Sequence, residues 1–135
     1  MLIRKANEKD LPHIVRLARK FDLDYEGMEA DAFWVAEADG RIAGIVGLRR
    51  HSDCRELCSL GVDESFRGRG LGRELVQALI EATEGDIYLA TIIPRYFEKA
   101  GFVRVSEFPI SMVKKAEWCA GCDRNFCAVM LREAA

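Results

Sequence analysis

The sequence contains no apolar run that approaches 18 residues, so it predicts no membrane-spanning helix. Its N-terminus lacks the apolar stretch of a secretory signal, and a cytoplasmic protein is therefore expected. A net charge of only −2 gives no reason to expect attraction to nucleic acid or to an acidic membrane. Internal repeats, linkers and low-complexity segments are also missing, and 135 residues leave no room for a second core of ordinary size. We therefore expect one globular domain over residues 1–135.

What the sequence does contain is an Arg- and Gly-rich loop between an apolar run and a helical pattern. Residues 57–62 are mostly apolar and predict a buried strand. Gly68, Gly70 and Gly72 follow at a spacing of two, and glycine accepts a left-handed backbone and lets a ligand approach closely. From Leu71 onward, apolar residues recur on one helical face. This order predicts an anion site, because free N–H groups and the positive end of the helix dipole face such a loop.

The spacing of the glycines indicates which phosphate ligand the loop would bind. A P-loop needs Lys followed by Ser or Thr, and the chain has no such pair. The dinucleotide fingerprint Gly-x-Gly-x-x-Gly is also missing. What remains is Arg67-x-x-Gly70-x-Gly72, which resembles the acyl-coenzyme A loop of the GNAT superfamily of N-acyltransferases. The alternative is a basic surface turn that caps a helix.

The periodicity of the remaining chain predicts an α/β fold. Asn7 is a candidate helix cap with Asp10 as its capping-box partner, Asp39-Gly40 is a candidate hairpin turn, and Gly85 and Gly101 are candidate helix ends. The expected strands cover residues 1–5, 33–38, 42–48, 55–62, 86–91, 102–105 and 126–131. The expected helices cover residues 8–21, a short segment within 22–31, 71–84 and 94–100, with a polar loop at 49–53. This order predicts a mixed sheet with helices on both faces.

A second motif extends the resemblance. The segment from Tyr96 through Phe97 to Gly101-Phe102 is similar to the second GNAT signature, a helix that ends in Gly-Phe. Residues 56–62 and 95–97 make the chain most similar to the acetyltransferase domain of bacterial N-acetylglutamate synthase and its single-domain relatives. The resemblance implies a GNAT-type mixed, mostly antiparallel central sheet flanked by helices on both faces.

The resemblance also implies an enzyme that transfers an acetyl group from acetyl-CoA to an amine by direct attack. The pyrophosphate would lie on N–H groups of the loop, and the pantetheine arm would pair with backbone near Leu60 and Val62. The implied coenzyme A contacts are Leu60, Val62, Arg67, Gly68, Arg69, Gly70, Leu71, Gly72, Arg73 and Phe97.

Glu56 is the candidate base that removes a proton from the incoming ammonium. It lies six residues before Val62 on the expected strand and matches the acidic position of the similar subgroup. The alternative is that Glu56 pairs with Arg49 or Arg55 on a solvated edge.

The candidate acid is less well defined. Many GNAT enzymes have Tyr four residues before the Gly of Gly-Phe, and here that position is Phe97, which cannot donate a proton. Tyr96 is one residue earlier, about 100° round the helix, and is the candidate donor to the leaving thiolate. The alternatives are water, a thiolate that leaves unprotonated, and a Tyr96 that only packs.

The expected acceptor is the primary amine of a small molecule, and amino acids are among the candidates. An Arg that would help hold the substrate carboxylate in the glutamate synthases maps to Ile92, although Arg49, Arg50 or Arg95 could replace it. One alternative is a coenzyme A-binding module with weak or no catalysis. Another is a protein or polyamine acetyltransferase, since the acidic residues within 22–31 would favour a cationic acceptor. A homodimer is expected by analogy alone.

Five cysteines raise the question of a metal site. The spacing of Cys119, Cys122 and Cys127 favours metal or redox use over structural disulfides in a cytosolic chain. A zinc site needs four ligands, and these are three. The fourth would be Asp123, Cys54, His51, water or a group from a second subunit. Thiols without a ligand are the favoured interpretation, so no metal is expected.

Overall fold

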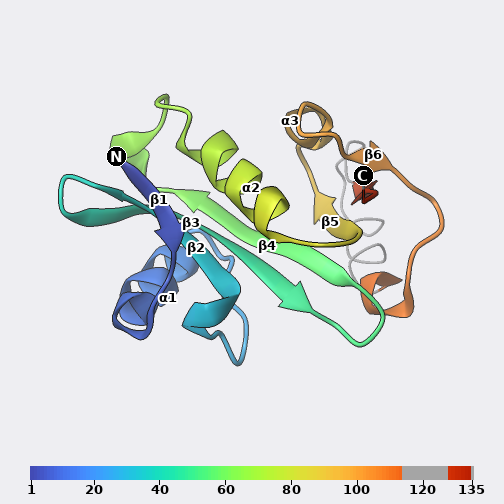
Figure 1. The fold of residues 1–135 in the computed structure, drawn as a ribbon, viewed down its shortest axis with the longest axis horizontal. Helices are drawn as coiled ribbons and strands as arrows, with labels where there is room; N and C mark the ends of the chain where they lie inside the picture. The colour runs from blue at the N-terminus through green and yellow to red at the C-terminus, as the bar shows by residue number, and fades with distance from the viewer. Residues whose placement is uncertain (114–127, 135) are drawn as a thin grey trace. The chain divides into compact units, whose positions relative to one another are not determined.

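The computed structural model describes residues 1–113 and 128–134 (Figure 1). The chain divides into two compact units, each treated by itself. The first consists of Met1–Leu48 and Cys58–Thr83, and the second of Arg49–Leu57 and Glu84–Ala135. The expectation of one domain over residues 1–135 stays a prediction. Among the described residues, none of the helices combines the length and apolar character that a membrane crossing requires.

The first unit is built on consecutive antiparallel strands. Strand β1 (Leu2–Lys5) pairs with β2 (Phe33–Ala38), and β2 pairs with β3 (Arg41–Arg50). Between β2 and β3, Asp39 and Gly40 have φ angles of 52° and 73°, as a two-residue hairpin turn requires. The turn predicted from Asp39-Gly40 is therefore confirmed. Strand β4 (Arg55–Val62) follows β3 in the strand order.

Two helices cover opposite faces of these strands. Helix α1 (Leu11–Lys20) and β2–β3 share a buried apolar cluster that includes Ile14, Phe33 and Ile45. Helix α2 (Leu71–Ala82) lies on the other face, where Leu75 approaches Gly44. Neighbouring residues of a strand point to opposite faces of the sheet. The face that carries Ile45 therefore packs against α1, and the face that carries Gly44 packs against α2, on opposite sides of the strands in Figure 1. The expected sheet with a helix on each face is present in this unit.

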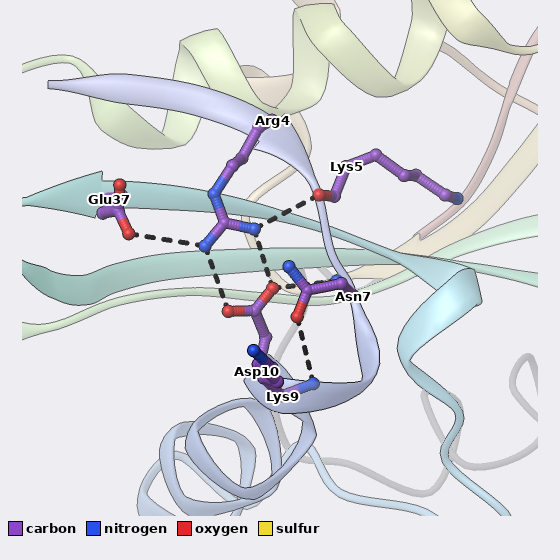
Figure 2. Close-up of polar contacts among 6 residues, drawn as sticks. All are labelled: Arg4, Lys5, Asn7, Lys9, Asp10 and Glu37. Atoms are coloured by element: carbon purple, nitrogen blue, oxygen red, sulfur yellow. Dashed lines mark hydrogen bonds and ion pairs between the residues drawn. The ribbon is translucent and has the colours of Figure 1, made fainter.

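A polar network fastens β1 to the start of α1 (Figure 2). The Arg4 guanidinium donates two hydrogen bonds to the Asp10 carboxylate, at 2.7 and 3.0 Å, and lies 3.4 Å from Glu37 Oε1. The Asn7 N–H also donates to Asp10, and the Lys9 N–H donates to the Asn7 side chain. Asn7 and Asp10 thus form the capping box expected from the sequence, here at the 3₁₀ turn Glu8–Asp10 that leads into α1.

We expect Asp10→Asn to lower the free energy of unfolding by about 2 kcal/mol, because it removes charged hydrogen bonds from a buried site. The Arg4 guanidinium holds the pKa of Asp10 below its ordinary value of 3.8, with the Asn7 N–H acting in the same direction and burial opposing both. A lowered folded-state pKa stabilises the fold above the ordinary value, and this contribution is lost as the pH falls through the folded-state value.

Urea unfolding at several pH values measures this effect, and the gap between wild type and Asp10→Asn should narrow below pH 3.8. Asp24→Asn is the matched control, because Asp24 lies 3.8 Å from Arg19 in an exposed pair worth less than about 1 kcal/mol. Equal losses in the two variants would contradict the prediction.

The second unit contains the remaining elements. Strand β5 (Ile87–Thr91) pairs in parallel with β4 at Glu56 and Tyr88, and antiparallel with β7 (Ala128–Arg132). The short strand β6 (Val103–Arg104) pairs antiparallel with β7. Helix α3 (Pro94–Glu98) precedes Gly101, whose φ of 93° ends the helical path. The described pairings are thus antiparallel except for one, which confirms an α/β fold with a mixed, mostly antiparallel sheet.

Several predicted boundaries were wrong. The helix expected within residues 22–31 is absent, because Asp22 and Gly27 adopt left-handed φ angles of 61° and 82°, and a 3₁₀ turn at Ala30–Ala32 follows. Strand β3 extends to Arg50, so the predicted polar loop at 49–53 is shorter. Helix α2 ends at Ala82 instead of residue 84, because the Thr83 hydroxyl donates a hydrogen bond of 2.6 Å to the Leu79 carbonyl.

The ends of the last elements also differ. Strand β5 begins one residue later than predicted, α3 ends two residues earlier, and β6 has only two residues of the four expected. Strand β7 extends one residue further, to Arg132, while its predicted start at residue 126 lies outside the described residues. Short elements leave few residues to define a period, so their ends depend on neighbouring strands.

Candidate active site

The loop after β4 is built on a cap and a buried aromatic ring. The Ser65 N–H donates to the Asp63 carboxylate at 3.0 Å, which fixes the 3₁₀ turn Glu64–Phe66 and lowers the pKa of Asp63. Phe66 is buried, and the guanidinium groups of Arg41 and Arg69 lie 5.3 and 5.1 Å from the centre of its ring. Two positive charges are therefore held at the base of the loop by cation–π contacts.

The glycines of this loop adopt the backbone that the motif predicts. Gly68 and Gly70 have φ angles of 84° and 77°, and a side chain at either position would meet nothing within 4 Å. Gly70 is the N-cap of α2, and the Glu74 N–H bonds to its carbonyl. Gly72 lies within the first turn of the helix. The free N–H groups of this first turn face an open, cationic loop, which is the geometry of an anion site.

The other basic residues of the loop are exposed. The Arg67 Nε donates to the Val62 carbonyl at 3.2 Å, and its guanidinium lies 5.1 Å from the centre of the Phe21 ring. Arg73 extends from the first turn of α2. The structure thus brings the predicted loop residues 67–73 together at one helix N-terminus.

Strand β4 has an irregular backbone at Ser59, which lies in the sequence between Glu56 and the loop at 67–73. Ser59 has a left-handed φ of 54°, which is uncommon for a residue with a side chain, and its hydroxyl donates to the Leu23 carbonyl at 2.8 Å. After it, Leu60 and Val62 are both half-buried. These are the residues whose backbone was predicted to pair with a pantetheine arm.

Glu56 is buried near the start of β4, with 3% of its surface exposed. Its Oε1 lies 2.9 Å from the Nε2 of His51, a half-buried residue just after β3. This burial contradicts the solvated edge that the alternative interpretation assumed for Glu56. A buried carboxylate with a hydrogen-bonded imidazole is a suitable arrangement for accepting a proton.

Asp53 and Cys54 precede Glu56 in the hairpin, and Tyr88 lies opposite it on β5. Burial, and then the charges of Asp53 and Glu56, raise the pKa of the Cys54 thiol to about 11, so this thiol is neutral near pH 7. Burial also raises the pKa of Tyr88, the residue opposite Glu56 on β5. The Asp53 carboxylate accepts a hydrogen bond from the Ser111 N–H at 3.0 Å, which ties the β3–β4 hairpin to the 3₁₀ turn Ile110–Met112.

Tyr96 and Phe97 belong to α3. Tyr96 is 38% exposed, and its ring meets the Phe97 ring edge-on at 5.1 Å between centroids. Phe97 is 5% exposed and packs edge-on against Phe102. Tyr96 is therefore partly exposed, whereas Phe97 belongs to the core of the second unit.

The cysteine prediction is only partly covered by the structure. Cys54 and Cys58 are free thiols, and the described residues contain no group of three or more side chains that could hold a metal ion. Cys119, Cys122 and Cys127 lie outside the described residues.

A comparison with protein families agrees with this geometry. Residues 3–102 match the model of the acetyltransferase (GNAT) family. The chain belongs to this family. The match covers the loop at 67–73, Glu56 and α3, and it confirms the resemblance drawn from the two motifs.

Curated relatives are larger than this GNAT chain. The human N-acetylaspartate synthetase is 36% identical over 63 residues, which are 45% of this chain and 21% of the human protein. The amino-acid acetyltransferase of Neisseria meningitidis serogroup A is 25% identical over 132 residues, 86% of this chain and 30% of that protein. The chain therefore spans less than a third of the length of either relative.

Solved structures share the fold of this GNAT chain. N-acetylglutamate synthase from Neisseria gonorrhoeae, complexed with coenzyme A and N-acetyl-glutamate, has a TM-score of 0.78 at 23% identity over 99% of this chain and 35% of its own. Rv2747 from Mycobacterium tuberculosis, solved in complex with CoA, has a TM-score of 0.79 at 21% identity over all of both chains.

Sequence reasoning missed two residues of the candidate site. His51 was considered only as a zinc ligand, although it is one of two histidines in the chain and stands five residues before Glu56 in a hairpin. Nothing in the sequence pointed to Ser59, because neither residue composition nor hydrophobic periodicity predicts a left-handed residue inside a strand.

Proposed function

We propose that this chain is an acetyl-CoA-dependent N-acetyltransferase that acetylates the primary amine of an amino acid. The observation that carries the coenzyme assignment is the loop at 67–73. Gly68 and Gly70 leave open space where a side chain would stand, at the N-terminus of α2 and next to Arg67, Arg69 and Arg73 in the chain. These residues fit a pyrophosphate, and the backbone near Leu60 and Val62 would hold the pantetheine arm. When bound, acetyl-CoA supplies the thioester acyl group.

The chain's own residues then handle the proton. Glu56 accepts it from the ammonium of the acceptor, and this leaves a neutral amine that can attack a carbonyl carbon. Phe97 cannot donate a proton to a leaving thiolate, so the donor is the exposed Tyr96 or water, unless the thiolate leaves unprotonated.

The acceptor class rests on the printed names of relatives. One is named for acetylaspartate synthesis, one for amino-acid acetylation, and one structural neighbour contains N-acetyl-glutamate. Ile92, where an Arg was expected from the glutamate synthases, argues against glutamate itself. An amino acid other than glutamate is therefore our preferred acceptor.

Two alternative functions are each supported by one specific observation. A coenzyme A-binding module without catalysis is favoured by the buried Phe97 at the usual acid position. A polyamine or protein acetyltransferase is favoured by the exposed acidic side chains within residues 22–31. Those side chains are Asp22, Asp24, Glu26, Glu29 and Asp31.

Calorimetric titration followed by a turnover panel distinguishes these functions. We expect both acetyl-CoA and desulfo-coenzyme A to bind, because the contacts are to the phosphates. We then expect thiol release with amino acids to exceed that with spermidine or a lysine peptide. Binding without turnover on any amine would indicate the binding module, and no binding by a folded sample would overturn the coenzyme assignment.

A further inference from the structure

Two arginines contact the same buried ring just before the loop at 67–73. Phe66 has 3% of its surface exposed, and the guanidinium carbons of Arg41 and Arg69 lie 5.3 and 5.1 Å from the centre of its ring. Arg41 is the first residue of β3, whereas Arg69 belongs to the loop that precedes α2. Residues from two distant parts of the chain thus bring two positive charges to one side chain.

No carboxylate is paired with either guanidinium in the described part of the chain. There, neither group forms an ion pair or a hydrogen bond, and both side chains are exposed. The Asp63 carboxylate is nearby, but it accepts the Ser65 N–H, and Lys20 and Arg41 lower its pKa only through their charges. Because neighbouring cations repel each other, an anion that contacts both guanidinium groups would be stabilised.

The other arginines of the loop are placed differently. Arg67 donates to the Val62 carbonyl, and its guanidinium lies over the Phe21 ring. Arg73 lies in the first turn of α2, whose free N–H groups already fit a diphosphate. The pair on Phe66 is therefore additional positive charge. Coenzyme A carries an additional phosphate, a monoester at the 3′ position of its ribose, and a phosphate monoester has a charge of about −1.5 to −2 at pH 7.

We propose that Arg41 and Arg69 form a binding site for the 3′-phosphate of coenzyme A, with Phe66 as the platform that holds both guanidinium groups. This inference rests on the proposed function, because it adds a subsite for the coenzyme assigned to the loop. A cation–π contact occupies the face of the ring and uses none of the guanidinium N–H groups in a conventional hydrogen bond. Those donors remain available to bind phosphate oxygens in pairs.

Calorimetry with coenzyme A and with 3′-dephospho-coenzyme A tests this site, because the two ligands differ only in that phosphate. We expect wild type to bind coenzyme A at least about tenfold more tightly. Arg41→Gln should weaken coenzyme A binding by about tenfold and leave the Kd for 3′-dephospho-coenzyme A unchanged. Arg69→Gln should have the same selective effect. Both positions are exposed, so a glutamine is tolerated there.

Arg16→Gln is the matched control, because it removes the same charge from an exposed position on α1 and should change neither Kd. Equal affinity of wild type for the two ligands would overturn the proposal. An Arg41→Gln variant that loses affinity for both ligands equally would also overturn it. The proposed function would stand in both cases, since coenzyme A still binds. If folded wild type binds neither ligand, the coenzyme assignment falls, and this site falls with it.

Steady-state kinetics provide a second readout. The 3′-phosphate is remote from the thioester, so its contacts stabilise the bound substrate and the transition state equally. We expect Arg41→Gln to raise the KM for acetyl-CoA by about tenfold without changing kcat. A lower kcat at an unchanged KM would show that Arg41 acts on the reaction instead of on the 3′-phosphate, and it would overturn the proposal.

Discussion

Replacing Glu56 with glutamine is expected to lower kcat by about 10²- to 10⁴-fold while acetyl-CoA affinity stays near that of wild type. The amide has the size of the carboxylate and its oxygen can still accept the hydrogen bond from His51 Nε2, so the buried site keeps its shape. It cannot accept a proton at neutral pH. The loss is therefore confined to the proton-transfer step, and titration with acetyl-CoA together with steady-state kinetics measures the two quantities separately.

Asp10→Asn provides the control for this experiment. Asp10 is also a buried carboxylate, but it belongs to the Arg4 network at the start of α1 (Figure 2). We expect that variant to lose stability and keep kcat, so the pair separates the chemistry of Glu56 from the general cost of neutralising a buried acid. Wild-type turnover in Glu56→Gln would show that Glu56 is not the base.

Replacing Gly70 with valine is expected to raise the Kd for desulfo-coenzyme A at least tenfold, which equals about 1.4 kcal/mol. Gly70 caps α2 with a φ of 77°, a conformation that costs other residues about 1–2 kcal/mol and suits β-branched side chains least. The valine side chain would also stand in the open space over the loop, where the pyrophosphate is expected. Calorimetry with the desulfo analogue measures binding without any reaction.

Gly40→Val is the matched control for this variant. Gly40 has a φ of 73°, and a side chain there would also meet nothing within 4 Å, but it lies in the β2–β3 hairpin turn. Both variants should lose similar stability, and only Gly70→Val should lose coenzyme affinity. If Gly70→Val does not fold, Arg73→Ala at the exposed first turn of α2 replaces it, with a smaller loss that weakens further with salt. Unchanged affinity in both loop variants would contradict the assignment.

The parts of the fold that the sequence predicted are those that depend on local rules. Asp39-Gly40 requires a tight turn because both residues tolerate left-handed backbone, and the structure has that turn. Asn7 and Asp10 can satisfy each other's neighbouring N–H groups through a capping box, and they do so. The helix expected within residues 22–31 is absent. Its apolar residues Leu23, Tyr25 and Met28 pack against the buried cluster shared by α1 and β2–β3 without forming one helical face.

The candidate site divides in the same way. The loop at 67–73 could be predicted because glycine spacing and a following helix define an anion site within a few residues. The contact between Glu56 and His51 could not be predicted, because the sequence pointed to Arg49 or Arg55 as partners of Glu56 and to His51 only as a metal ligand. In the structure, the turn closed by the His51 N–H and the Cys54 carbonyl holds His51 Nε2 2.9 Å from Glu56 Oε1.

The sequence by itself determined the family, the order of the described strands, and the left-handed glycines of the loop, because each depends on residue type over a short range. The tertiary structure alone decided which side chains meet across the chain. Gly47 shows the reason, since a side chain there would lie 2.9 Å from the Phe33 ring, a contact set by strand register and helix packing. In the second unit, the hairpin between β3 and β4 likewise brings the buried Glu56, the candidate base, beside His51.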